Sequence, residues 1–174
     1  RVIEAAPGEV WLATLGPMTN AAILIRDHPD VASKLKGVVC MGGEPTRPFP
    51  EYNIRLDAEA ADLVFRSGLL KFVGTYDVTK RIVMDDHDMA RLAVAETPVA
   101  RILTECIRLW KPFAGKKPGP IVYDMCPLVW LFAPELFTTR RRALRVELEP
   151  PDRRGMVSET TDGTLMEEIG RAHV

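Results

Sequence analysis

Three short apolar runs, each followed by a chain break and then by a helical pattern, limit what this chain can fold into more than any other feature. The runs cover residues 10–15, 38–41 and 69–76, and their length and apolar character are typical of buried strands. Strands that alternate with helices predict a parallel sheet, because parallel neighbours are joined by a crossover, and such crossovers are right-handed.

Helical patterns account for most of the remaining chain. We expect helices over residues 19–28, 31–35, 57–67, 85–95, 98–112 and 125–132, and one further strand, 143–149, with a hairpin partner within 154–159. The sequence therefore predicts an α/β fold in which a mostly parallel sheet carries helices on both faces.

Composition excludes several classes of partner. The 174 residues suffice for one domain with a real core, and 47% of them are hydrophobic. Lys and Arg (23) balance Asp and Glu (24), so the net charge of -1 gives no electrostatic reason to expect nucleic acid or membrane as a partner.

The three cysteines lack the spacing of a zinc or disulfide framework, and we expect reduced, buried thiols. No signal-peptide pattern is visible, which favours a cytoplasmic location.

Both ends of the sequence look unnatural. The chain starts at Arg1 without a methionine, and the run at residues 10–15 looks like a buried strand whose neighbours are absent. The last residues, 168–174, read like the translation of a common sequencing-library adapter. We therefore expect residues 1–167 to be the middle and C-terminal part of one incomplete domain, and residues 168–174 to be a non-native tail.

The candidate functional residues lie in the loops after the strands. The carboxyl ends of parallel strands meet at one edge of a sheet, where ligands bind. This edge collects residues 15–20, Glu51 and Asn53, together with Tyr123 and Asp124 if the approach to the last buried helix ends there. The structural alternative is that Glu51 and Asn53 cap and solvate a surface turn and that Asp124 caps the helix after it. No GxGxxG, Walker A or GxSxG motif is present, which disfavours dinucleotide enzymes, P-loop enzymes and serine hydrolases.

Four blocks of the sequence together resemble the inosine-uridine preferring nucleoside hydrolases. In chain order they are LGPMTN at 15–20, MGG at 41–43, EYNIRLDAEAA at 51–61 and YDMCPL at 123–128. One block alone is a weak signal, but their order and spacing form a specific signature. The resemblance covers essentially the whole chain before the tail and corresponds only to the middle and later part of the family's domain.

The resemblance implies an activity and a cofactor. Its members cleave the N-glycosidic bond of ribonucleosides with water, giving ribose and a free base in purine and pyrimidine salvage, with one calcium ion (Ca2+) in the site. It assigns the backbone carbonyl of Leu15 and the carboxylate of Asp124 as metal ligands, and calcium prefers such oxygen ligands. The other aspartates, including the general base, belong to an N-terminal Asp-rich block that this sequence lacks. We therefore expect this chain alone to be inactive and the parent protein to be a homo-oligomer.

The resemblance also assigns residues to the substrate. Glu51 and Asn53 match the ribose-binding pair, and Met41 would line the sugar pocket; a carboxylate accepts hydrogen bonds from sugar hydroxyls, and an amide both donates and accepts. Tyr123 stands where nonspecific members carry a histidine that protonates the leaving base. It is the candidate leaving-group donor, although a phenol with a pKa of about 10 is a weaker acid than imidazolium. Phe113 is a candidate to stack over the base, with core packing as the alternative.

Two other functions stay open on the sequence. The tyrosine at position 123 suggests a non-catalytic nucleoside- or sugar-binding protein on the same fold. A general doubly wound domain that binds another polyol is the third reading, in which the motif matches are fortuitous.

Overall fold

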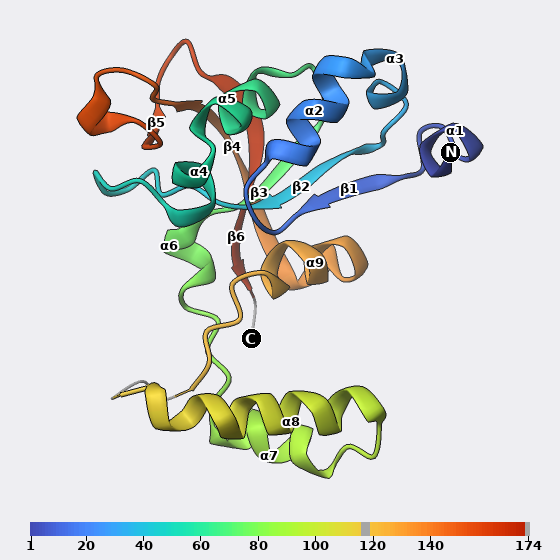
Figure 1. Ribbon diagram of the computed structural model, residues 1–174, viewed down its shortest axis with the longest axis vertical. Helices are drawn as coiled ribbons and strands as arrows, with labels where there is room; N and C mark the ends of the chain where they lie inside the picture. Colours follow the sequence, from blue (N-terminus) through green and yellow to red (C-terminus); the bar gives the residue numbers. More distant parts are fainter. Residues whose placement is uncertain (116–118, 173–174) are drawn as a thin grey trace.

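A six-stranded sheet forms the centre of the structure, a computed structural model that describes residues 1–115 and 119–172. The strands are β1 (Trp11–Thr14), β2 (Gly37–Met41), β3 (Lys71–Gly74), β4 (Phe137–Val146), β5 (Val157–Glu159) and β6 (Thr164–Ala172). Their order in the sheet is β1-β2-β3-β6-β4-β5 (Figure 1). The first four of these are parallel neighbours, whereas β4 runs antiparallel to both β6 and β5.

Helices cover both faces of this sheet. They are α1 (Val2–Ala5), α2 (Thr19–Asp27), α3 (Pro29–Ala32), α4 (Tyr52–Leu56), α5 (Ala58–Arg66), α6 (Tyr76–Thr79), α7 (Asp86–Val94), α8 (Pro98–Trp110) and α9 (Met125–Phe132), with single 3-10 turns η1 (Lys111–Phe113), η2 (Pro134–Leu136) and η3 (Pro151–Arg153). Helices α2 and α5 lie on one face and α9 on the other, while the α7–α8 hairpin extends away from the sheet (Figure 1). The predicted α/β fold, with a mostly parallel sheet covered on both faces, is confirmed.

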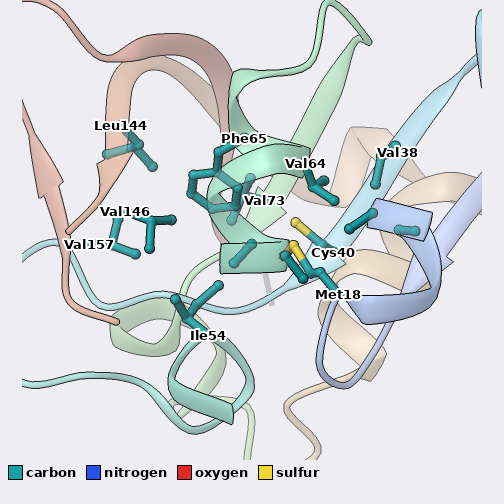
Figure 2. Close-up of a cluster of buried hydrophobic side chains, with 14 of the residues drawn as sticks. Met18, Val38, Cys40, Ile54, Val64, Phe65, Val73, Leu144, Val146 and Val157 are labelled. Atoms are coloured by element: carbon teal, nitrogen blue, oxygen red, sulfur yellow. The ribbon is translucent and has the colours of Figure 1, made fainter. Parts of the chain in front are cut away.

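The main hydrophobic core lies under α2 and α5. Helix α5 turns Ala61, Val64 and Phe65 toward the sheet, and their spacing of three and four residues places them on one helical face. Phe65 is 1% exposed and packs in a cluster with Leu144 and Val146 of β4 (Figure 2). The alanines of α2 and α5 let the two helices approach each other closely.

A smaller cluster on the opposite face fixes α9. Trp130 of α9 stacks on Phe72 of β3 with ring centroids 3.8 Å apart, and Trp11 of β1 meets both rings edge-on. Cys126 is buried in the same cluster, where a lack of water raises the pKa of its thiol to about 12. Anchoring α9 in this way sets the position of Tyr123 and Asp124, which directly precede it.

Several segments differ from the predicted elements. Helix α1 was not predicted, α6 begins at Tyr76 within the strand predicted over 69–76, and β4 covers Phe137–Val146 where a strand was predicted over 143–149. Residues 52–56, expected as part of a loop, form the short helix α4, and strand β6 has no counterpart among the predicted strands. Residues 168–174 were set aside in the sequence analysis, whereas β6 continues to Ala172 and buries Glu168 and Ile169 fully. The sequence of β6 does not show the apolar pattern of a strand because it contains charged residues. Glu167 pairs with Arg141 and Glu168 with Arg140 across the β4–β6 ladder. The non-native origin of residues 168–174 stays a prediction, and residues 173–174 lie outside the described part.

Three further expectations concern cysteines and membranes. The cysteines are free thiols, as expected, but Cys106 of α8 is exposed, so the prediction that all three are buried is wrong. An amphipathic helix that leaves the sheet exposes part of its apolar stripe, which explains the exception. Within the described residues, none of the helices has the length and apolarity that crossing a bilayer requires.

Candidate active site

A cavity of about 330 Å³ opens at the carboxyl edge of the sheet, where β1, β2 and β3 end. Its lining residues come from loops far apart in the sequence: Leu15, Met41, Glu51, Tyr52, Asn53, Tyr76, Tyr123 and Asp124. They include all of the predicted site residues except Phe113. The structure therefore brings the three predicted loops together. Tyr52 and Tyr76 are additions to the predicted set.

Glu51 is a buried carboxylate held by backbone N–H groups. Its Oε2 accepts hydrogen bonds from the amides of Gly43 (3.2 Å), Asn53 (3.0 Å) and Ile54 (3.2 Å). Two of these donors belong to the first turn of α4, so Glu51 caps this helix, as the structural alternative supposed. It is only 4% exposed and lines the cavity, however, and it therefore does not serve a solvated surface turn.

Gly43 shapes the turn that makes this arrangement possible. Its φ of +81° lies in the left-handed region, which a residue with a Cβ adopts only at a cost. This conformation aims its N–H at Glu51 while its carbonyl accepts a bond from the backbone N–H of Tyr76 at 2.8 Å. The glycine thus joins the end of β2 to α4 on one side and to α6 on the other.

Asn53 ties α4 to the end of β2. Its side-chain nitrogen donates to the backbone carbonyl of Met41 at 3.1 Å and approaches the Met41 sulfur at 3.4 Å. These contacts fix the orientation of the amide, so that the nitrogen is used within the protein. The amide oxygen of Asn53 takes no part in either contact.

Leu15 and Asp124, the two predicted metal ligands, line the same cavity. Asp124 directly precedes α9, yet its side chain makes no capping hydrogen bond, and partial desolvation raises the pKa of its carboxyl. Both residues offer oxygen, as a hard cation requires, whereas calcium takes about six to eight oxygen ligands. Within residues 1–115 and 119–172, no group of three or more His, Cys, Asp or Glu side chains is placed to hold a metal ion.

Tyr123 lies beside a second tyrosine, Tyr76, that sequence reasoning missed. The two rings are stacked with centroids 5.7 Å apart and planes at 16°. Burial, followed by the nearby Tyr76, raises the pKa of Tyr123, so the phenol keeps its proton at neutral pH. The signal for Tyr76 was its position two residues after β3, at the same edge of the sheet as the other candidates.

A buried glutamate, Glu44, interacts with Arg47 and Lys80, the two cationic side chains that lie over the ring of Tyr76. Glu44 accepts bonds from Arg47 at 2.9 Å and from the backbone N–H of Thr46 at 2.9 Å, and Lys80 lies 4.0 Å away. Burial pushes the pKa of Glu44 upward, but the bonds from Thr46 and Arg47 outweigh it and hold the pKa below its ordinary range.

The structure does not bring Phe113 to the cavity. It lies on η1, is 87% exposed, and lines neither this cavity nor a larger apolar groove of about 950 Å³ between the α7–α8 hairpin and α9. Trp110 lines that groove, and Tyr123 lines both spaces. A base-stacking role for Phe113 thus stays a prediction that this arrangement does not support.

Comparison with known proteins gives a consistent result at the level of sequence. The family model described as inosine-uridine preferring nucleoside hydrolase matches residues 1–172. The pyrimidine-specific ribonucleoside hydrolase RihA of Shewanella woodyi is 31% identical over 98% of this chain and 60% of its own length. RihA of Escherichia coli O9:H4 is 34% identical over 90% of this chain and 53% of its own length.

Solved structures agree with the fold. A plant nucleoside hydrolase superposes with a TM-score of 0.86 at 20% identity, covering 98% of this chain and 60% of that one. A purine-preferring ribonucleoside hydrolase from Gardnerella vaginalis gives 0.85 at 23% identity, covering 99% and 58%. This chain therefore spans little more than half the length of the relatives it matches. By sequence and by fold, it belongs to the inosine-uridine preferring nucleoside hydrolase family.

Proposed function

We propose that the full-length protein hydrolyses the N-glycosidic bond of ribonucleosides to ribose and a free base. The observation that carries this proposal is the cavity at the sheet edge, in which Glu51, Asn53, Tyr123 and Asp124 meet in a chain of this family. The carboxylate and amide suit sugar hydroxyls, the phenol suits a leaving base, and the carboxylate of Asp124 suits a cation.

Glu51 and Asn53 bind the ribose in this proposal. Because Oε2 of Glu51 holds three backbone N–H groups, the carboxylate is fixed, and Oε1 accepts from a sugar hydroxyl. The nitrogen of Asn53 is occupied by Met41, so its oxygen faces the ligand. Fixed acceptors of this kind stabilise an oxocarbenium-like transition state without reorganising during the reaction.

Leu15 and Asp124 contribute to a metal site in the full-length protein. The family is metal-dependent, and we propose that the ion is calcium, because the donors on this chain are a carbonyl and a carboxylate. When bound there, such an ion would supply the Lewis acidity that activates a water molecule. The remaining ligands and the general base come from the part of the family domain outside this chain.

Tyr123 donates a hydrogen bond to the departing base. Its raised pKa keeps the hydroxyl protonated at neutral pH, and its ring lies in the same cavity as the ribose-binding pair. A neutral phenol stabilises the negative charge that develops on the leaving base, although it transfers a proton less readily than imidazolium.

Ribose release from uridine and inosine tests the proposal. We expect calcium-dependent release by the full-length protein, a loss of about 10²-fold or more in Glu51→Ala, and no release by residues 1–174 alone. Release by the isolated chain above its own Glu51→Ala control would show that the general base lies within it. That result would contradict the proposed division of the site.

The rival function is a non-catalytic nucleoside- or sugar-binding protein, which the phenol of Tyr123 in place of a stronger acid favours. A nitrophenyl riboside separates the two, since its leaving group needs little protonation. Cleavage of the nitrophenyl riboside supports an enzyme; ribose binding without cleavage of any substrate supports the rival. Homo-oligomeric assembly stays a prediction from the family resemblance, and a cytoplasmic location stays a prediction from the sequence, in which no signal-peptide pattern is visible.

A further inference from the structure

We propose that Tyr76 is a positioning residue that holds the hydroxyl of Tyr123 in place for the leaving base. The inference rests on the function proposed above and names a residue that the family signature does not include. It starts from the stacked tyrosine pair, in which both rings line the cavity that also contains Glu51 and Asn53.

The two tyrosines reach the cavity from separate elements. Tyr76 is the first residue of α6, after β3, and Tyr123 lies in the loop that leads into α9. The two rings are stacked with their centroids 5.7 Å apart and their planes at 16°. Within residues 1–115 and 119–172, Tyr123 makes no other aromatic stacking contact. An offset stack restricts the tilt and the position of a ring. Tyr76 therefore restricts where the Tyr123 hydroxyl can lie.

Tyr76 is itself held firmly enough to serve as a reference. Phe49 packs edge-on against its ring at 5.4 Å, and the cationic groups of Arg47 and Lys80 lie 5.7 Å and 5.4 Å from its ring centroid. The buried carboxylate of Glu44 binds Arg47 and lies near Lys80. The ring of Tyr76 is thus fixed by neighbours that do not line the cavity.

The backbone links Tyr76 directly to the ribose side of the site. The N–H of Tyr76 donates to the carbonyl of Gly43, and the N–H of Gly43 donates to Glu51. Gly43 therefore links the carboxylate of Glu51 to the backbone of Tyr76 through one hydrogen bond on each side. This arrangement lets Tyr76 place Tyr123 relative to the sugar, where an error of about 1 Å costs up to about 10²-fold in rate.

The inference makes a specific claim about how the two tyrosines depend on each other. If Tyr76 acts through the Tyr123 hydroxyl, its removal has no further effect once that hydroxyl is gone. If Tyr76 instead contacts the substrate independently, the effects of the two substitutions multiply. A double-mutant cycle separates these cases.

The test uses the full-length protein with uridine, inosine and a nitrophenyl riboside. We expect Tyr76→Leu to lower kcat on the natural nucleosides by about tenfold to a hundredfold, with KM nearly unchanged and the nitrophenyl riboside little affected. Tyr76→Phe keeps the stack and should retain most of the activity. In a Tyr123→Phe background, Tyr76→Leu should cause no additional loss.

Tyr52→Leu is the matched control, because Tyr52 also lines the cavity but is not stacked on Tyr123. Any loss it causes should be the same for all three substrates. Equal losses on natural and nitrophenyl substrates in Tyr76→Leu, or losses that multiply with Tyr123→Phe, would overturn the inference while leaving the proposed function intact. If the wild-type protein cleaves none of the substrates, the proposed function fails, and the inference fails with it. Melting temperatures of all variants identify any that fold poorly, and Tyr76→Phe then decides whether the ring is sufficient.

Discussion

At the residue scale, Glu51 has a structural task that can be measured apart from any activity. Its carboxylate satisfies three backbone N–H groups and caps α4. In Glu51→Ala these donors lose their partner in a buried place, and we expect a loss of about 2 kcal/mol in the free energy of unfolding. Chemical denaturation of the full-length protein measures this loss. Glu59→Ala is the control, since it removes only an exposed pair with Arg154 and should cost less than about 1 kcal/mol. Equal stability of Glu51→Ala and wild type would contradict the capping role.

Glu44 gives the protein a dependence on acid. Its pKa in the folded protein lies below the ordinary glutamate value of 4.5, since bonds from Thr46 and Arg47 outweigh the effect of burial. A depressed folded pKa means that the unfolded chain binds the proton more readily. The stabilising contribution of Glu44 is therefore fully present above pH 4.5 and is lost as the pH falls through the folded pKa. We expect the melting temperature of wild type to fall more steeply below pH 4.5 than that of Glu44→Gln. Parallel curves for the two proteins would rule this contribution out.

At the scale of the element, Asp57 joins two helices of the main core. Its Oδ1 accepts from the amide of Ala60 at 3.1 Å and caps α5, while its Oδ2 accepts from the hydroxyl of Thr19 in α2 at 2.5 Å. Asp57→Ala should lower the free energy of unfolding by about 1–2 kcal/mol, because the cap and the link to Thr19 are both lost. Asp57→Asn keeps a side-chain oxygen that caps the helix equally well, so it should retain most of the free energy of unfolding that Asp57→Ala loses. Thermal unfolding of the three proteins checks this, and an equal loss in both variants would show that charge matters more than capping.

The elements also show which parts of the fold could be predicted from the sequence. Helix α9 and strand β2 were predictable because continuous apolar runs with clear ends identify them. Helix α4 was not, because a helix of five residues has too little periodicity, and its cap comes from Glu51 through a bond network with Gly43. Strand β6 alternates poorly because its glutamates pair with arginines of β4, a partner that no local pattern reveals.

The candidate site could also be predicted in part from the sequence. Glu51 and Asn53 lie in the loop after β2, so topology alone predicted that they would lie at the carboxyl edge of the sheet. Asp124 precedes α9 instead, and the sequence placed it at this edge only if the approach to that helix ends there. Tyr76 follows β3 and was predictable in the same way, but its stack with Tyr123 depends on the path of a loop more than forty positions away in the sequence. Phe113 has an aromatic side chain near that loop, yet it lies on η1 directly after α8, and only the structure shows that it does not line the cavity.

At the scale of the whole molecule, the calcium site that we propose for the full-length protein predicts that calcium stabilises that protein and not this chain alone. An ion that binds only the folded state adds RT ln(1 + [L]/Kd) to stability, about 2.7 kcal/mol when its concentration is one hundred times Kd. Leu15 and Asp124 supply too few oxygens for this by themselves. We expect calcium to raise the melting temperature of the full-length protein, Asp124→Asn to remove most of that rise, and residues 1–174 to show none. Asp85→Asn is the control, because Asp85 caps α7 on the hairpin and does not line the cavity. An equal rise in the isolated chain would place a complete calcium site within it, and an undiminished rise in Asp124→Asn would place the ion elsewhere in the molecule.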